Sequence, residues 1–394
     1  MPVREISALL RVPGLALILV AQLAARFPAG MYTLGILMHV ERQQGTYTAA
    51  GLVLAAFSAG MAIAGPPVSR LLSRFGTLPV LSITLVISVT AFILLAAFPT
   101  LPLPWLIVLG ALGGAAMPPV IPAVRTLYPR ITPQHMLTSL FSFDAALQEI
   151  IWVIGPVAIT MLVAAFGTTT ALLVVVGIQV LGGLMFILAP AVRSLKIPPA
   201  TRKLGRVLQN PSVVLMMVTS ALFLGAFAAV EAGVVASFDE GSIRAGVVLG
   251  IASVGSLIGG LATGNRPISR WSLAIRTLIM VVGLTLAGLL SGFWGLSVAL
   301  FIAGIGIAPA LAAVSAVIAG SVSFSDTAEA YGWIGTGQLL GTSLCAAAGG
   351  IAIDAVGASG AMYVAAGTAT LALIVAVLFR KAQPDLRGGI SILD

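Results

Sequence analysis

The sequence predicts an all-α membrane protein in which twelve transmembrane helices form two six-helix bundles related by pseudo-twofold symmetry. Three observations lead to this prediction. Only 8% of the 394 residues are charged, whereas soluble domains carry about 25%, so the chain could not cover a surface that faces water. Apolar runs of membrane-spanning length follow one another along the whole chain. The second half of the chain also repeats rare features of the first half.

The apolar runs define the expected helices. A helix needs about 20 mainly apolar residues to cross the hydrocarbon core. The runs are continuous, whereas strands of a membrane barrel alternate over about ten residues. Twelve runs meet the helical length: 14–38, 47–68, 78–98, 105–127, 138–165, 169–190, 211–236, 243–263, 272–290, 294–320, 328–353 and 359–378.

Lys and Arg are distributed unequally between the two ends of these helices. If the N-terminus is cytoplasmic, 17 basic residues fall on the cytoplasmic side, and only Arg42 and Arg244 fall on the outer side. Trp105 and Trp294 open helices at the outer interface, where amphipathic rings are favoured. We therefore expect a multi-pass protein of the cytoplasmic (inner) membrane with both termini in the cytoplasm.

The longest polar break, residues 191–210, contains five basic residues and separates six runs from six. We expect an N-terminal six-helix bundle over residues 1–190, a cytoplasmic linker over 191–210, and a C-terminal six-helix bundle over 211–394.

The two halves share a repeat. An offset of 190 residues pairs Pro119 with Pro309 and Gln148 with Gln338. Proline and glutamine are rare in membrane spans, so these coincidences carry weight. A parallel repeat of six helices predicts two halves related by an axis along the membrane normal.

This plan resembles that of the major facilitator superfamily over nearly the whole chain. The family has a signature between its second and third helices, roughly Gly-x-x-x-Asp-Arg-x-Gly-Arg. The matching stretch, residues 69–77, reads Ser-Arg-Leu-Leu-Ser-Arg-Phe-Gly-Thr, in which Arg74 and Gly76 fit, whereas Ser73 replaces the Asp. The resemblance implies a monomeric transporter without a cofactor, with Arg74 in its cytoplasmic gate. Gly155-Pro156 in the fifth run is similar to the end of a pattern in the family's exporters.

Ionisable residues inside the spans are the first functional candidates, because each costs at least about 2.5–3.5 kcal/mol at the bilayer centre. Arg26 lies near the middle of the first run, too deep to reach the interface easily. We expect Arg26 to line a central cavity between the halves, where it binds an anion or acts in gating. The alternative is a structural ion pair with a neighbouring helix.

The fifth run carries several polar residues. Asp144, Gln148 and Trp152 are spaced by four and share a helix face, whereas Glu149 is rotated by about 100° from Gln148. Because neighbouring helices are antiparallel, Asp144 and Arg125 can meet near the cytoplasmic end, as a structural pair or an inner gate. Trp152, away from either interface, indicates a cavity or helix-contact position.

Glu149 is the predicted carrier of a coupling proton. It lies deeper than Asp144, burial disfavours the charged form of a carboxyl group, and we expect Arg26 nearby. A permanent structural bridge between Glu149 and Arg26 is the alternative. Glu231, nearer the outer side, could titrate or merely face the outer vestibule. Gln338 repeats Gln148, and paired amides suit polar substrates, although amides also join helices.

Other chemistries are set aside. The chain has no Gly-Lys pair for a phosphate-binding loop, and its two histidines, His39 and His135, lie on opposite sides of the membrane, so no metal site is expected. The net charge of +8 forms no basic stripe, so we expect no nucleic-acid partner. Solvated positions are expected for the remaining acidic residues near helix ends: Asp239, Glu240, Asp326, Glu329 and Asp354.

These observations favour a secondary active transporter of a small organic solute, driven by protons and working as an exporter by alternating access. It is not expected to be an enzyme, because His, Cys and Lys are scarce. One alternative is an importer or facilitator of a sugar-like or carboxylate solute, based on Arg26 and the two glutamines. The other alternative is a lipid-moving membrane protein.

Overall fold

The computed structural model describes residues 3–45, 47–98, 101–195, 197, 203–238, 243–264 and 266–387. Asp239, Glu240 and part of the expected linker lie outside these residues. The described residues form helices and contain no β-strand. Eleven helical segments are long and apolar enough to cross a membrane, and one of them, Gln134–Leu188, has 55 residues. Gly167, with φ of 77°, divides this segment into two helices, so the predicted twelve-span, all-α fold class is confirmed.

The first half of the chain is built from α1 (Val3–Leu10), α2 (Leu15–Arg26), α3 (Ala29–Gln44), α4 (Tyr47–Phe75), α5 (Thr77–Ala97), α6 (Leu103–Ala115), α7 (Val120–Ile131), α8 (Leu137–Leu188) and α9 (Pro190–Ser194). The second half is built from α10 (Pro211–Ala236), α11 (Ile243–Thr263), α12 (Ser272–Leu289), α13 (Gly292–Ala319), α14 (Thr327–Val356) and α15 (Ala358–Leu378). Short 3-10 turns lie at Gln134–Met136, Arg206–Gln209 and Arg380–Ala382.

Two predicted spans are broken helices. The first span consists of α2 and α3, which meet at Phe27 and Pro28, directly after Arg26. The fourth span consists of α6 and α7, which are separated at residues 116–119. Pro118 and Pro119 explain the second break, because proline has no N–H to donate to the preceding turn. Such breaks are tolerated in a membrane where the freed backbone groups are buried in protein or line a cavity.

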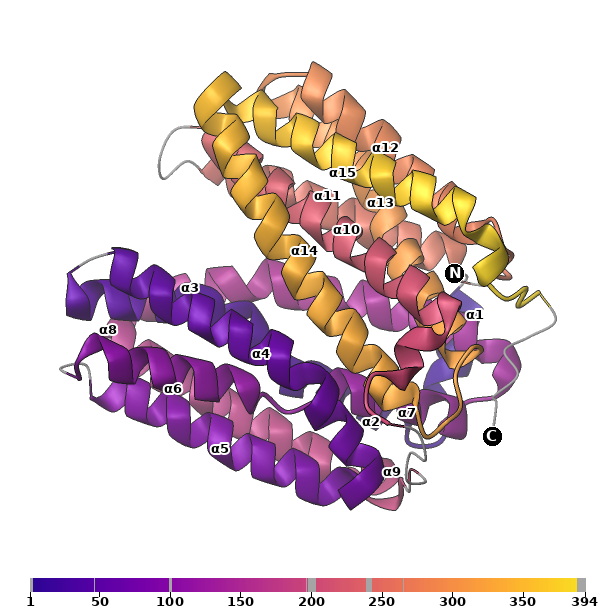
Figure 1. Ribbon diagram of the computed structural model, residues 1–394, viewed down its shortest axis with the longest axis horizontal. Coiled ribbons are helices and arrows are strands. Elements are labelled where there is room, and N and C mark those ends of the chain that lie inside the picture. Colours follow the sequence, from indigo (N-terminus) through magenta and orange to yellow (C-terminus); the bar gives the residue numbers. More distant parts are fainter. Residues whose placement is uncertain are drawn as a thin grey trace.

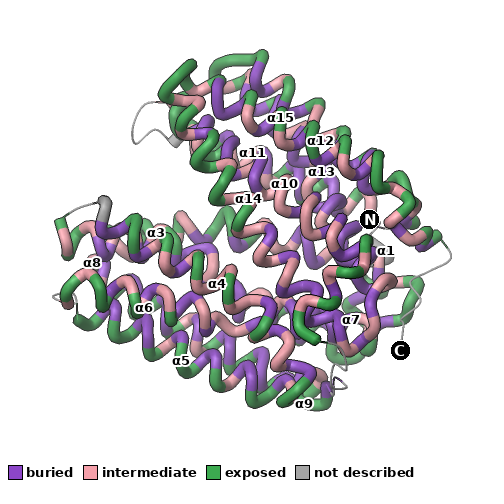
Figure 2. The backbone as a smooth tube through the Cα atoms, viewed as in Figure 1, coloured by how far each residue is buried: buried purple, intermediate pink, exposed green. Residues whose placement is uncertain are grey.

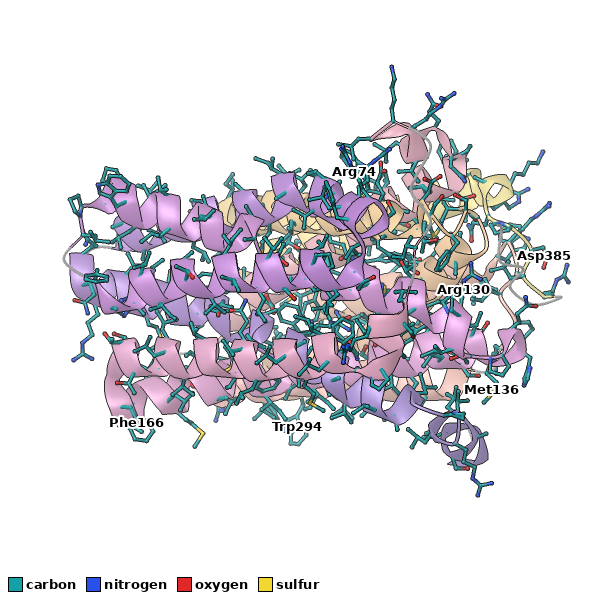
Figure 3. All side chains as sticks on the ribbon, turned by 90° about the horizontal axis from the view of Figure 1, so that it is seen from below. Arg74, Arg130, Met136, Phe166, Trp294 and Asp385 are labelled. Atoms are coloured by element: carbon teal, nitrogen blue, oxygen red, sulfur yellow. The ribbon has the colours of Figure 1, made fainter. Side chains whose placement is uncertain are left out.

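The two halves meet at one end and diverge at the other (Figure 1). We call the end that carries α1 and α9 the terminal end, and the opposite end the distal end. Arg130 and Asp385 lie toward the terminal end and Phe166 lies at the distal end (Figure 3). Along most helices buried positions alternate with exposed ones, as expected of helices with one face in a bundle (Figure 2).

Several helix pairings join the halves, and two of them are close enough to need small residues. α14 approaches α4 so closely that a Cβ on Gly332 would lie 2.8 Å from the Cα of Pro66. On the other side, α8 packs against α11, where a Cβ on Gly260 would lie 3.3 Å from the Cβ of Ala146. Within the halves, glycine again permits close packing: a Cβ on Gly114 would overlap the Phe57 carbonyl. Small residues at helix contacts supply van der Waals packing where lipid removes the hydrophobic drive.

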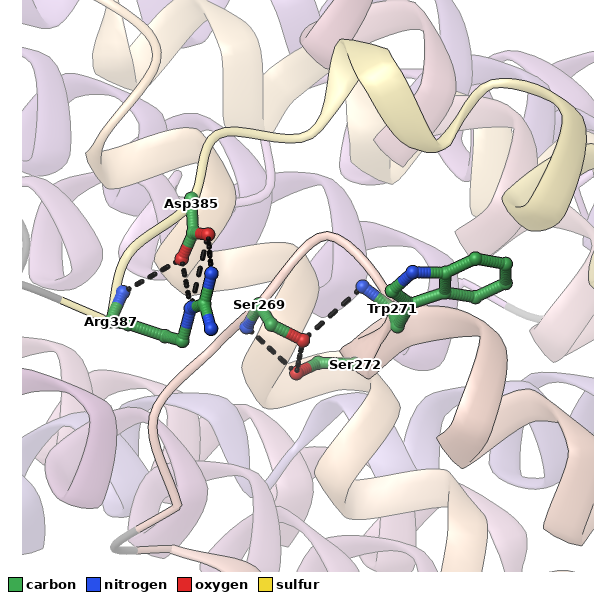
Figure 4. Close-up of polar contacts among 5 residues, drawn as sticks. All are labelled: Ser269, Trp271, Ser272, Asp385 and Arg387. Atoms are coloured by element: carbon green, nitrogen blue, oxygen red, sulfur yellow. Dashed lines mark hydrogen bonds and ion pairs between the residues drawn. The ribbon is translucent and has the colours of Figure 1, made fainter.

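The C-terminal segment is anchored at the terminal end. The Leu386 N–H donates to the Ile268 carbonyl between α11 and α12 (2.9 Å). Arg387 donates to both carboxylate oxygens of Asp385, close to the Ser269–Ser272 turn (Figure 4). The hydrogen bonds from Arg387 lower the pKa of Asp385, which keeps this exposed carboxyl group charged at neutral pH. The segment after the last span is therefore tied to the second half.

Candidate functional site

A cavity of about 180 Å³ lies where the halves meet. α4, the α6–α7 break, α8 and α14 all contribute to its wall. Most of the wall is apolar, with methionine, proline, valine and leucine side chains. Six polar side chains interrupt it: Ser69, Arg125, Gln148, Tyr331, Thr336 and Gln338. A largely apolar cavity with a few converging polar groups is the usual form of a small-molecule site.

Arg125 is the charged residue of this wall. It lies in α7, one and a half turns after the break at Pro119. Its guanidinium carbon lies 5.4 Å from the centroid of the Tyr331 ring in the other half, a cation–π contact. The residue is 7% exposed, and its Nε has no hydrogen-bond partner. Arg125 donates no hydrogen bond of normal geometry to a described residue, and its one ion pair, from Nη2 to Asp144, is long (3.6 Å).

Asp144 is the counter-ion behind this wall and is fully buried on α8. Its two carboxylate oxygens lie 3.6 Å from Arg125 Nη2 and 3.6 Å from Arg26 Nη1. The Tyr128 hydroxyl also donates to Asp144 (3.0 Å). The structure thus brings Arg125 and Asp144 together, as expected from the sequence. Two guanidinium groups share one carboxylate, which leaves one uncompensated positive charge beside the cavity.

Arg26 does not line the cavity, contrary to the sequence-based expectation. Its Nη1 donates to Gln22 (2.7 Å), and its Nη2 donates to Gln148 on the wall. The break after α2 directs Arg26 toward α8, where the carboxylate of Asp144 and the amide of Gln148 provide better partners than an open cavity. Arg26 therefore lies behind Gln148 and orients its amide group.

Gln148 and Gln338 both lie on the cavity wall, one from each half. They are the two residues that the 190-residue offset pairs. The repeat therefore places equivalent amide groups on opposite sides of one cavity, and either amide can donate to or accept from a bound solute.

Glu149 does not pair with Arg26, contrary to the sequence-based expectation. Its carboxylate accepts a hydrogen bond from the Ser256 hydroxyl of α11 (2.9 Å), and the same hydroxyl accepts from the Ala308 N–H of α13 (3.2 Å). The rotation between successive residues of a helix explains the difference, because it directs Glu149 to the other half while Gln148 faces Arg26. Glu149 thus belongs to a contact between the halves.

Two other expected site residues lie away from the cavity. Trp152 is 50% exposed beside exposed Val153 and Ile154 and is absent from the wall. Eight residues after Asp144, the helix face has rotated by about 80°, which turns Trp152 out of the bundle. Glu231 is exposed on the part of α10 nearer the distal end and has no ion-pair partner among the described residues.

The terminal end of the cavity is closed by polar contacts between α4 and α14. Arg70 Nη1 donates to Glu329 (2.7 Å). Farther from this end, Thr336 donates to the Ala62 carbonyl (2.6 Å) and joins the same two helices. Glu329 also accepts from the Gly205 N–H of the linker (2.7 Å). Arg74, the residue expected in the gate, is exposed and lies over the Phe75 ring. Arg70, one helical turn earlier, makes the contact instead.

The solvated positions expected for Glu329 and Asp326 are wrong. Glu329 is 2% exposed and Asp326 is 6% exposed. Asp326 accepts from the Ser323 hydroxyl (3.0 Å) in the loop before α14. A helix end normally faces water, but here α14 begins inside the interface between the halves. The one feature of the sequence that could have indicated a buried partner for Glu329 was Arg70, a basic residue one turn before Arg74 on the same helix. In the described part of the chain, no group of His, Cys, Asp and Glu could hold a metal ion.

The family model described as Major Facilitator Superfamily matches residues 18–267 and 265–391. The chain belongs to the major facilitator superfamily. Members of this superfamily are transporters and not enzymes, which agrees with the fold. No curated protein sequence matches this transporter.

Solved structures of other transporters have the same fold. A bacterial homologue of the iron transporter ferroportin, in an outward-facing state, is 14% identical with a TM-score of 0.74, covering 93% of this chain and 99% of its own. The human organic anion transporter MFSD10 (TETRAN) is 15% identical with a TM-score of 0.72 and coverages of 92% and 99%. The transporter FucP, in the outward conformation, is 16% identical with a TM-score of 0.69 and coverages of 92% and 98%. These identities support a shared fold only.

Proposed function

We propose that this protein carries a small organic anion across the cytoplasmic membrane by alternating access. The observation that carries the proposal is the Arg125 guanidinium, which lies on the wall of the cavity and whose Nε has no hydrogen-bond partner. Two arginines share Asp144, so an anion in the cavity would balance the remaining positive charge. Arginine recognises carboxylates through paired N–H donors. A human organic anion transporter with this fold is compatible with the proposal.

The terminal end is proposed to be cytoplasmic. The support is the basic asymmetry of the sequence, because 17 Lys and Arg fall on that side. In this orientation the described conformation faces outward, since the contacts of Glu329 with Arg70 and Gly205 close the cavity at the terminal end. Reporter fusions at the C-terminus should be active in the cytoplasm. Activity confined to the periplasm would contradict the orientation.

Proton coupling through Glu149 and net export complete the proposal. Glu149 is the acidic side chain of α8 that reaches the other half, where it bonds Ser256. A proton on this carboxyl group would change a contact that alternating access has to remake. Glu149→Gln in liposomes should abolish accumulation driven by a pH gradient while substrate exchange persists. Unchanged accumulation, or loss of exchange together with folding, would exclude Glu149 as the proton carrier.

The test of the substrate class uses purified protein in liposomes and a panel of labelled carboxylates and neutral sugars. Carboxylates should be transported, and Arg125→Gln should lower their apparent affinity about 10- to 100-fold, because it removes a hydrogen bond to a charged group. Arg42→Gln, an exposed arginine at the end of α3, is the matched control and should leave transport unchanged.

A neutral, sugar-like substrate is the second candidate, and the two amides of Gln148 and Gln338 favour it. A sugar would use both amides and would not need the arginine. Transport of sugars but not carboxylates by the wild-type protein, with little effect of Arg125→Gln, would replace the anion proposal with this one.

A further inference from the structure

A second cavity, of about 400 Å³, lies between α4 and α14. It continues the first cavity toward the distal end. Leu339 lines both cavities, and Ala62 of the second lies beside Met61 of the first. α4 and α14 run in opposite directions, so lower numbers on α4 and higher numbers on α14 both lead away from the terminal end. Its wall consists of Gly51, Leu54, Ala55, Ser58, Ala59, Ala62, Leu339, Leu340 and Ser343.

The two cavities differ in polarity. The first contains a guanidinium group, two amides and a phenol. The wall of the second has no charged or amide side chain, and its polar side chains are the hydroxyls of Ser58 and Ser343. Ser343 donates to the Leu339 carbonyl of its own helix. The Thr336 hydroxyl donates a hydrogen bond to the Ala62 carbonyl. The second cavity therefore offers few polar groups to a solute.

The two cavities follow one another along α4 and α14 and share Leu339. From Ser69, in the first cavity, to Gly51, in the second, the wall follows α4 for 18 residues, which is about 27 Å of helix. The charged group lies at the terminal part of this length. A compact polar solute would use only the first cavity, and a solute that fills both would place apolar surface between α4 and α14.

We infer that the substrate is an amphiphilic anion. Its carboxylate or equivalent head binds Arg125, and an apolar tail lies between α4 and α14. This inference rests on the proposed function. Burial of each methylene in an apolar site is favourable, whereas a polyol placed there would lose its hydration without gaining hydrogen bonds.

The test measures binding of straight-chain carboxylates, from butanoate to dodecanoate, and of the alcohols of equal length, to the purified full chain in lipid nanodiscs. Empty nanodiscs correct for partition into lipid. The dissociation constant of the carboxylates should fall about fourfold per added methylene until the cleft is filled. At each length the carboxylate should bind more tightly than the alcohol.

Substitutions on α4 test where the apolar tail of the substrate binds. Ala55→Trp places a large ring in the second cavity and should weaken binding of long carboxylates more than that of short ones. Ile63→Trp, on the same helix but outside both walls and 78% exposed, is the matched control. If Ala55→Trp does not fold, Ala59→Ser should reduce the gain per methylene.

The outcomes separate the two proposals. Carboxylates that bind more tightly than alcohols but without dependence on length would overturn the amphiphile and leave the anion transporter standing. A dependence on length with no preference for carboxylates would overturn the anion site, and with it the amphiphilic anion. Equal effects of Ala55→Trp and Ile63→Trp would show that the tail lies elsewhere and would overturn the inference. If none of the carboxylates and none of the alcohols binds, both proposals are overturned.

Discussion

The two halves have the same helical plan but different polar chemistry. The first half supplies Arg26, Arg125 and Asp144, a charged cluster behind and on the cavity wall. The second half supplies Tyr331 and other uncharged groups to the same wall. A repeated fold has thus been divided between charged side chains in one half and an uncharged wall in the other.

The same difference is visible where the repeat places proline. Pro119 follows Pro118 and breaks the fourth span into α6 and α7, which brings Arg125 to the cavity. Pro309, its counterpart, lies inside the continuous helix α13. At this turn Arg276 donates an additional hydrogen bond to the Pro309 carbonyl (2.7 Å).

The sharpest test of this division is Asp144→Ala. It leaves two buried guanidinium groups without a carboxylate, so the free energy of unfolding should fall by about 3–5 kcal/mol. Equilibrium unfolding in mixed micelles measures the change. Asp354→Ala, at an exposed position near the end of α14, should change stability by less than about 0.5 kcal/mol. Equal losses in the free energy of unfolding for the two variants would contradict a special role for the charged cluster of the first half.

Arg276→Ala tests the second half in the same assay. It leaves the Pro309 carbonyl without its side-chain partner, and we expect a loss of about 1–3 kcal/mol. Arg266→Ala, at an exposed position before α12, serves as control. A loss as large as that of Asp144→Ala would mean that the charged cluster is not the dominant polar interaction of the protein.

Double-mutant cycles measure the interaction energies within the cluster of Arg26, Arg125 and Asp144. Arg125→Gln with Asp144→Asn, and Arg26→Gln with Asp144→Asn, should each show a coupling energy of about 0.5–3 kcal/mol in stability. Arg125→Gln with Asp354→Asn should be additive, because these residues belong to distant parts of the fold. Additivity between Arg125 and Asp144 would contradict an energetic pair, whatever their distance.

The smallest expected effect concerns the hydrogen bond from Thr336 to Ala62, which joins α4 to α14. Thr336→Val keeps the side-chain shape but removes the hydrogen bond to Ala62, and should favour opening of the terminal end by about 0.5–1.5 kcal/mol. Labelling of a cysteine placed at Ser69, in a Cys345→Ser background, reports this opening. Thr370→Val, whose hydroxyl bonds within α15, is the control. Slower labelling in Thr336→Val would contradict a closing role.

The spans could be predicted from the sequence because lipid imposes their length. The predicted breaks between them fall at structural breaks, including Gly167 within α8. The contact between Arg125 and Asp144 was also predictable, because antiparallel neighbours bring those helix ends together. In both cases short-range pattern and membrane geometry were sufficient.

The partners of Arg26 and Glu329 could not be predicted. Each depends on how two helices distant in sequence are rotated about their axes, and periodicity does not determine that rotation in a helix that is apolar all round. Glu329 bonds a residue 259 positions earlier. Trp152 was misplaced for the related reason that it lies eight residues after Asp144, and eight residues turn the helix about 80° beyond two full turns.

The hydrogen bond between the Gly205 N–H and Glu329 has a consequence for how the chain can be cut. Opening of the terminal end would separate Glu329 from Arg70, and the linker would have to yield or follow. A version expressed as two polypeptides, divided a few residues before Gly205, would leave this amide near a free end of chain. Such a split protein should assemble and yet close less firmly, because the covalent connection that presents the amide is gone.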